Sequence, residues 1–268
     1  MIKTATCLRC GATDMVDTMH RVKSPSKNYF YVCNHCRDYE ASYSAENGTF
    51  AHKQAKHGLT LSIEFETSVR NDDSNILYQY GFLPSSDGSI HGTEWKSPIY
   101  TNISGLSQMF KTIEGKTTVG TECGTHTNVG TFTATEMSHI VRFYHSLFVP
   151  LCEYMQQHAS DTITLFGRNF TYYANTINNN TTPTKHENFI NVQHNTHLEF
   201  RLAKFRTAEQ YIRLVKMCME MTKAVKTNFI EHFNDNRGGE NMTSYRKHKA
   251  SVTAKKLISI FKKYASIA

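Results

Sequence analysis

Long hydrophobic runs are missing from this 268-residue sequence. No segment reaches the roughly 18 apolar residues that a membrane-spanning helix requires, and the N-terminus lacks the pattern of a signal peptide. We therefore expect a soluble, cytoplasmic protein that has no membrane partner. The chain has seven cysteines. In such a protein they indicate metal binding and free thiols rather than a disulfide framework.

Acidic residues are nearly absent from the C-terminal end of the chain. From Arg237 onward there are eight basic residues and one acidic residue, Glu240, which gives this segment a net charge of +7. The whole chain also carries +7, so residues 1–236 are electrically balanced. A basic tail of this kind either binds nucleic acid or another polyanion, or forms a solvated helix face.

The first 50 residues contain two pairs of cysteines. Their spacing is C-x2-C-x22-C-x2-C, and the four residues are Cys7, Cys10, Cys33 and Cys36. Each pair places two thiolates on one tight turn, and four thiolates suit a closed tetrahedral Zn²⁺ site. We therefore expect a zinc-ribbon-like module over residues 1–50, in which Zn²⁺ is structural. A redox pair is the alternative, but no βαβ pattern follows it.

Three later segments share one pattern, in which polar residues at i and i+2 alternate with apolar ones. The segments span residues 59–66, 125–129 and 197–202. Side chains alternate between the two faces of a strand. The pairs expected to share a polar face are Glu64 with Glu66, His126 with Asn128, and Glu199 with Arg201. The side chains expected to face a core are Leu61, Ile63, Phe65, Leu198, Phe200 and Leu202.

Other patterns predict the remaining elements. Strands are expected at 29–32 and 92–98, and a short amphipathic helix at 104–113. A capping box at Thr133 predicts a helix to about His158 that Pro150 kinks or divides. Residues 160–173 are expected to be extended. A second capping pattern at Thr207 predicts a long helix to about Phe233, and a basic amphipathic helix is expected at 253–265.

The polar face of the three strands has the chemistry of a cation site. A set of ligands in which carboxylates predominate favours Mg²⁺ or Mn²⁺. Carboxylates that converge without a cation repel one another and raise their pKa values. The bound ions would then hold a triphosphate, and Arg201 would bind phosphate oxygens. The alternative for each carboxylate is a solvated sheet face.

Four segments, in order along the chain, resemble motifs of the amidoligase group within the glutamate–cysteine ligase and glutamine synthetase superfamily. The motifs are Gly58 with Ile63-Glu64-Phe65-Glu66; Asp87-Gly88-Ser89 with Glu94-Trp95-Lys96-Ser97-Pro98; Cys123-Gly124-Thr125-His126-Thr127-Asn128-Val129-Gly130; and Asn191-Val192 with Thr196-His197-Leu198-Glu199-Phe200-Arg201-Leu202. The resemblance covers residues 58–235. It implies an α+β fold in which a curved, mostly antiparallel sheet forms a funnel with flanking helices. The zinc module at residues 1–50 and the basic helical tail at residues 236–268 lie outside the resemblance.

The resemblance also implies an ATP-dependent carbon–nitrogen ligase that joins a carboxylate to an amine through an acyl phosphate. Its Mg²⁺ ligands would be Glu64, Glu66, Asp87, Glu94, His126 and Glu199. Asn128 would also help to bind the cofactor, and Arg201, Glu199 and Asp87 would serve catalysis. Asn128, Thr127 and Trp95 depart from the residues usual in the family, which leaves the shape of the substrate open.

Two other functions remain open at this point. The first is a non-catalytic nucleic-acid-binding protein that uses the zinc module and the basic tail. The second is a phosphohydrolase that uses the same cations, with water as the nucleophile. If the ligase acts on a macromolecule, the zinc module and the tail would bind that protein or nucleic acid.

Overall fold

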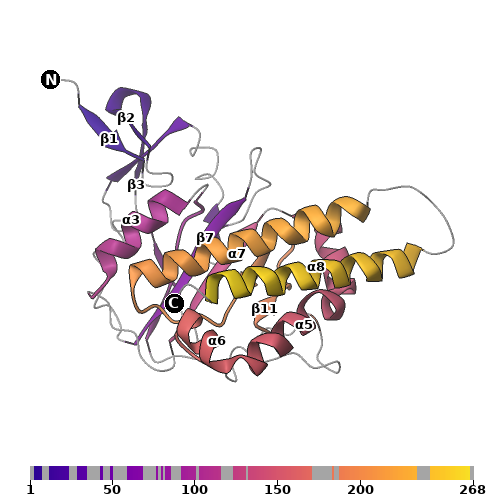
Figure 1. Cartoon of the computed structure of the whole chain (residues 1–268). Coiled ribbons are helices and arrows are strands. Elements are labelled where there is room, and N and C mark those ends of the chain that lie inside the picture. The colour runs from indigo at the N-terminus through magenta and orange to yellow at the C-terminus, as the bar shows by residue number, and fades with distance from the viewer. Residues whose placement is uncertain are drawn as a thin grey trace. The chain divides into compact units, whose positions relative to one another are not determined.

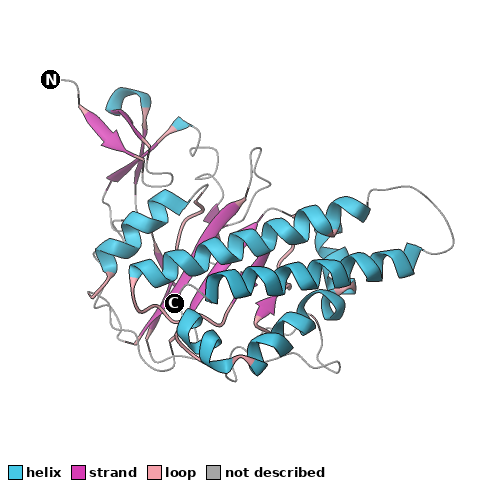
Figure 2. Cartoon of the chain, in the orientation of Figure 1, coloured by secondary structure: helices cyan, strands magenta, loops and turns pink. Residues whose placement is uncertain are grey.

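The computed structural model has mixed α and β structure (Figures 1 and 2). It describes residues 3–7, 12–23, 29–34, 43–44, 49–50, 59–68, 77, 80, 82–85, 92–100, 103–115, 123–130, 132–170, 183, 187–233 and 242–265. The chain divides into two compact units. The first comprises Met1–Thr131 and Lys204–Ile212, and the second Phe132–Ala203 and Arg213–Ala268.

The first unit contains an antiparallel ladder of four strands. The long strand β7 (Thr60–Thr67) pairs with β10 (Thr125–Gly130) on one side and with β9 (Thr93–Lys96) on the other. The short strand β8 (Leu83–Ser85) pairs with the outer side of β9. Figure 2 shows these strands in magenta. The predicted strands at 59–66, 92–98 and 125–129 and the mostly antiparallel sheet are thereby confirmed.

Apolar side chains of β7 form the core beneath this ladder, as the alternating pattern predicts. Leu61, Ile63 and Phe65 are fully buried. Phe65 meets Phe205 edge-to-face with ring centroids 5.5 Å apart, and Phe205 stacks on Phe110 at 5.4 Å. Phe110 lies in α3 (Ile103–Ile113), the amphipathic helix predicted at 104–113. Aromatic packing therefore holds α3 and the strands together.

The N-terminal part of the first unit consists of short hairpins. Strands β1 (Thr4–Thr6) and β2 (Thr13–Met15) pair with each other, and the 3₁₀ turn η1 (Val16–Thr18) follows them. The next pairs are β3 (His20–Lys23) with β4 (Tyr29–Val32), the strand predicted at 29–32, and β5 (Tyr43–Ser44) with β6 (Thr49–Phe50). Among the described residues of this part, the buried cluster is only Cys7, Met19 and Val32. So small a core needs another source of stability.

The second unit is mainly helical. Its helices are α4 (Ala134–Arg142), α5 (Tyr144–Gln157), α6 (Ala159–Phe166), α8 (Met242–Ala265) and most of α7 (Ala208–Asn228), which ends near the 3₁₀ turn η2 (Ile230–Phe233). Helix α8 packs along α5 and α6 (Figure 1). The unit also contains the antiparallel pair β11 (Ile190–Asn191) and β12 (His197–Phe200), and the predicted core residues Leu198, Phe200 and Leu202 are buried.

Three of the predictions about helical segments are wrong. The helix that begins at the capping box of Thr133 is interrupted at Phe143, and α5 then continues through Pro150. Residues 160–166 are helical rather than extended. Thr162 explains part of this difference, because its hydroxyl donates to the carbonyls of Met155 and His158 and so satisfies groups at the preceding helix end.

The last helix, α8, begins at Met242 rather than Thr253. Across the described residues, no helix is both long enough and apolar enough to cross a membrane. The described residues omit Asp87, Cys10 and Cys36, so these three predictions lie outside the structure.

Candidate functional site

Three strands of the first unit bring four acidic or histidine side chains to one face of the sheet. The register pairs His126 of β10 with Glu64 of β7, and Glu66 of β7 with Glu94 of β9. Residues opposite one another in an antiparallel ladder have their side chains on the same face. Residues that are far apart in the sequence therefore gather as the alternating pattern predicted.

His126 lies between two of these carboxylates. Its Nδ1 is 3.3 Å from Glu64 Oε2, and its Nε2 is 3.6 Å from Glu66 Oε1. Glu66 also accepts a hydrogen bond from the backbone N–H of Gly124 through its other oxygen. The imidazole is buried, so both of its nitrogens face carboxylates rather than bulk water.

The carboxyl group of Glu94 shows that negative charge is crowded here. Its pKa is raised from 4.5 to about 8, first by burial and then by the charge of Glu64. A side-chain hydrogen bond with Glu64 favours the protonated form further, while Lys96, 3.6 Å away, and His126 act in the opposite direction. Glu94 is therefore largely neutral at neutral pH when no cation is bound.

Asn128 adds an oxygen donor to the same face. Its amide nitrogen donates to Glu64 Oε1 at 3.1 Å, which orients the amide group. Its Oδ1 is buried and has no hydrogen-bond partner among the described residues. A buried carbonyl oxygen without a partner is costly, and a bound cation would satisfy it.

Burial argues against the alternative of a solvated sheet face. Glu66 is only 4% exposed and Glu94 only 6%. Charged carboxylates are almost never buried unless they are paired or bind a metal. The donors of this acidic face are the carboxylates of Glu64, Glu66 and Glu94, the imidazole of His126 and the amide oxygen of Asn128. Such a set, dominated by oxygen, fits Mg²⁺ or Mn²⁺.

The second unit contains a polar cluster around Glu199 in β12. Arg201 Nη1 donates to Glu199 Oε1 at 2.5 Å, and Asn191 Nδ2 donates to Oε2 at 2.6 Å. The pair of Glu199 and Arg201 is almost completely buried. Arg168 holds the backbone of this segment, since its guanidinium donates to the carbonyls of Arg201 and Leu202.

The sequence did not identify every member of this second cluster. His194 Nε2 lies 3.2 Å from Glu199 Oε2, and its ring stacks on His197 with centroids 4.2 Å apart. The only signal for these residues is the spacing H-x2-H-x-E. His194 lies in the connection between β11 and β12, where no alternating pattern predicts the direction of a side chain.

Two of the four predicted zinc ligands are described. The backbone N–H of Cys33 donates to Cys7 Sγ at 3.3 Å, which brings one residue of each cysteine pair together. The described cysteines are all thiols rather than disulfides. The positions of Cys10 and Cys36 lie outside the described residues, so four-coordinate zinc stays a prediction.

The family resemblance proposed from the sequence finds no independent support in comparisons with known proteins. No family model matches the chain, and no curated protein matches it either.

Proposed function

We propose that the protein is an ATP- and Mg²⁺-dependent ligase that joins a carboxylate to an amine. The observation that carries the cation-dependent chemistry of this proposal is the acidic face of the first unit. Three glutamates crowd beside His126, and the pKa of Glu94 rises to about 8 without a cation. A bound cation would favour the ionised form of Glu94 at neutral pH.

The donor set supports Mg²⁺ or Mn²⁺ rather than zinc as the bound cation. Glu64, Glu66, Glu94 and His126 would hold the cations, with Asn128 Oδ1 as a further oxygen donor. Asp87 is proposed as another ligand because of its place in the motif. When bound, the cations would neutralise the phosphate charge of ATP and position its γ-phosphoryl group.

In the proposed reaction, a carboxylate oxygen of the substrate attacks the γ-phosphorus of ATP, and ADP leaves. The resulting acyl phosphate is then attacked by the amine, and phosphate leaves as the amide forms. Arg201 is proposed to stabilise the negative charge that develops on the phosphoryl oxygens. It is already paired with Glu199, so Glu199 would orient its guanidinium, and Glu199 is also proposed as a Mg²⁺ ligand.

The motifs, not the acidic face, favour ligation over hydrolysis. A phosphohydrolase would use the same cations with water as the nucleophile. The funnel shape of the sheet is proposed on the same resemblance, and the N-terminal zinc knuckle on the spacing of the four cysteines. An enzyme of this kind would act in the cytoplasm, where ATP and Mg²⁺ are available.

The proposal is tested by measuring ADP release while candidate carboxylates and amines are screened, including amino acids, polyamines and peptides. We expect an amine to stimulate ADP release and a matching amide product to appear by mass spectrometry. Glu64→Gln should abolish both, because it removes a cation ligand. Glu114→Gln, which changes an exposed glutamate after α3, is the matched control and should keep full activity.

Two outcomes would contradict ligation. ADP release that no amine or carboxylate changes would identify a hydrolase. The absence of ADP release in every combination, together with no binding of Mn²⁺ to the wild type, would remove both enzymatic functions.

A further inference from the structure

Helix α8 concentrates the positive charge of the second unit. It contains seven Lys or Arg residues and no acidic residue. Several of these cations already have partners: Arg246 lies over the Phe233 ring at 4.4 Å, and Lys263 pairs with Glu220 of α7 at 2.7 Å. Lys255 and Lys256 are exposed, and no described residue pairs with either.

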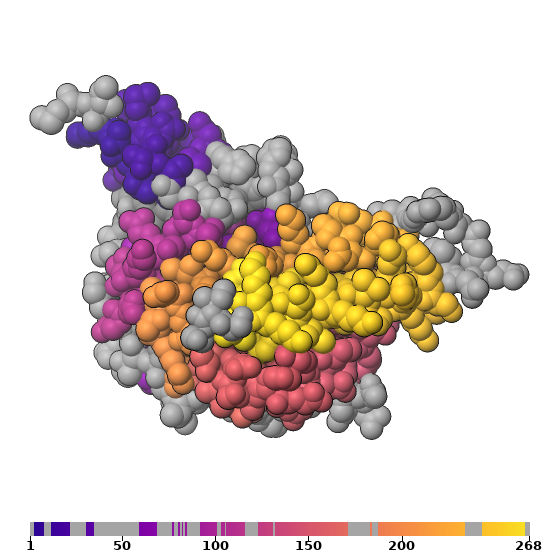
Figure 3. All heavy atoms as spheres, viewed as in Figure 1, coloured from indigo at the N-terminus to yellow at the C-terminus, as the bar shows by residue number. Residues whose placement is uncertain are grey.

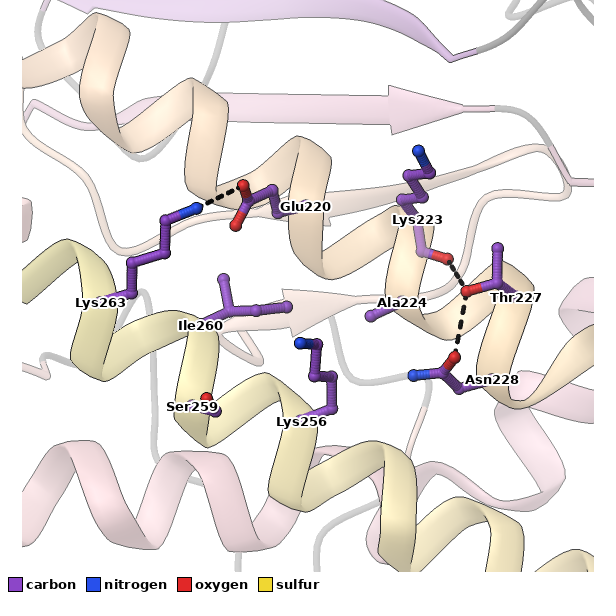
Figure 4. Close-up of a pocket in the computed structure, with 9 residues that line it drawn as sticks. All are labelled: Glu220, Lys223, Ala224, Thr227, Asn228, Lys256, Ser259, Ile260 and Lys263. Carbon is purple, nitrogen blue, oxygen red and sulfur yellow. Dashed lines mark hydrogen bonds and ion pairs between the residues drawn. The ribbon is translucent and has the colours of Figure 1, made fainter.

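A hollow of about 420 Å³ lies between α7 and α8 (Figure 4). Its charged lining residues are Lys223, Lys256, Lys263 and Glu220. Glu220 is the one acidic residue among them, and Lys263 binds its carboxylate. The lining therefore carries a positive charge that its own acidic group does not balance.

The polar atoms that face the hollow are mainly donors. Figure 4 shows the Lys256 ammonium and the Asn228 amide nitrogen both pointing into the space between the helices. The Thr227 hydroxyl is shared between the carbonyl of Lys223 at 3.0 Å and Asn228 Oδ1 at 3.2 Å, and the contact with Oδ1 directs Nδ2 of Asn228 away from Thr227. Ser259 adds a hydroxyl from α8. Cationic and N–H donors together fit an anion that offers several oxygens, as a phosphate group does.

The basic surface also extends beyond the hollow. Lys256 and Lys263 are seven residues apart, or about 10.5 Å along the helix axis. Lys216 and Lys223 have the same spacing on α7, and both are exposed. Figure 3 shows α7 and α8, in orange and yellow, side by side on one face of the molecule. Rows of lysine on neighbouring helices fit an extended polyanion rather than a single small anion.

The basic surface of α7 and α8 lacks the features of a protein–protein interface. Stable protein partners usually bury aromatic or large aliphatic anchors. Among the described residues the exposed large hydrophobic side chains are Met15, Ile163 and Val252, and only Val252 belongs to α8. The apolar residues that line the hollow, Ala224 and Ile260, are themselves buried.

We propose that the α7–α8 surface binds the phosphodiester backbone of a nucleic acid, independently of base sequence. Lys223 and Lys256 would each contact phosphate, and Asn228 Nδ2 would donate to a phosphate oxygen. The proposal does not depend on ligase activity, because none of these residues belongs to the acidic face or to the Glu199 cluster.

The test measures binding of a short fluorescein-labelled DNA duplex to the full chain by anisotropy, over a series of KCl concentrations and without ATP or Mg²⁺. The double variant Lys223→Glu with Lys256→Glu should weaken binding at least tenfold. The slope of log K against log[salt] should fall by about two, since each phosphate contact contributes roughly 0.9 for duplex DNA. Lys3→Glu with Lys111→Glu changes the net charge equally at exposed sites of the first unit, and should leave the slope unchanged.

Three outcomes would overturn the proposal: no binding by the wild type, equal losses in both double variants, or displacement of the duplex by polyglutamate at an equal or lower charge concentration. The last result would point to an acidic protein partner instead.

The single variant Lys256→Gln, checked by circular dichroism, keeps the test valid if the double variant misfolds, and its slope of log K against log[salt] should fall by about one. Glu64→Gln should bind DNA normally, so failure of the ligase proposal is distinguishable from failure of this one.

Discussion

Glu94 is the residue whose protonation should be most visible in solution. Its pKa is about 8 in the folded chain, raised by burial and by Glu64, against 4.5 in a model peptide. Between pH 4.5 and 8 the folded state therefore holds a proton that the unfolded state has released. The contribution of Glu94 to stability is complete below pH 4.5 and is lost as the pH rises to 8, by up to about 1.4 kcal/mol per pH unit.

The prediction is that Glu94→Gln removes this part of the pH dependence, because glutamine cannot ionise. Urea unfolding in EDTA at several pH values from 5 to about 8.5 measures it, and the wild type should lose stability relative to the variant as the pH rises. Glu114→Gln is the control for loss of an exposed carboxylate. If the curves of wild type and Glu94→Gln ran parallel, the pKa of Glu94 would not be raised.

The buried pair of Glu199 and Arg201 should be sensitive to loss of one partner. Arg201→Met leaves the Glu199 carboxylate buried beside Asn191 and His194 but without the guanidinium that pairs with it. We expect a loss of about 3–5 kcal/mol in the free energy of unfolding. The double variant Arg201→Met with Glu199→Gln should lose less than Arg201→Met alone, because no uncompensated charge remains. Chemical denaturation of the wild type and the two variants tests this order, and a double variant that is no more stable than Arg201→Met would contradict it.

The sequence predicted the secondary-structure elements correctly where a single local pattern determined them. Strand β7 alternates strictly, and α3 and α7 have clear helical spacing, so their existence was predictable. The break in the helix at Phe143 was not predictable, since no glycine or proline marks it. Pro150 is the stronger signal for a helix break in the sequence, yet α5 continues through it. Helix α6 contains β-branched Thr162 and Ile163, which favour strands locally. Leu165 and Phe166 of this helix are buried, so tertiary packing rather than local propensity accounts for the helical conformation.

The N-terminus of α4 offers a test of a single element. The Thr133 hydroxyl accepts from the backbone N–H of Glu136, and the Glu136 carboxylate accepts from the N–H of Thr133 and from Lys226. Thr133→Ala should therefore lower the free energy of unfolding by about 1 kcal/mol. Thr133→Ser keeps the capping oxygen and should retain most of that stability. Thermal or urea unfolding distinguishes the two, and equal losses would mean that packing of the methyl group matters rather than the cap.

At the scale of the whole molecule, the sequence predicted the acidic face better than the cluster around Glu199. Glu64, Glu66, His126 and Asn128 alternate on strands, so their common face follows from a period of two. The pKa of Glu94 could not be predicted, because it depends on burial and on the distance to Glu64 rather than on sequence neighbours. The contact of His194 with Glu199 depends on the path of the chain between β11 and β12, which has no periodic pattern.

The zinc module provides the last prediction at this scale. Its described core is only Cys7, Met19 and Val32, and metal binding supplies the folding free energy in units with so little apolar burial. The purified protein should contain one Zn²⁺ per chain by elemental analysis, and Cys7→Ser should lose most of it. Cys152→Ala, which removes a buried thiol of α5, should retain zinc fully. Because a closed zinc site would stabilise the N-terminal hairpins, chelation should make them sensitive to protease while the helices of the second unit stay resistant. A wild-type protein that lacks zinc, and whose N-terminal hairpins nevertheless resist protease, would show that Cys7 and Cys33 lie together through packing alone.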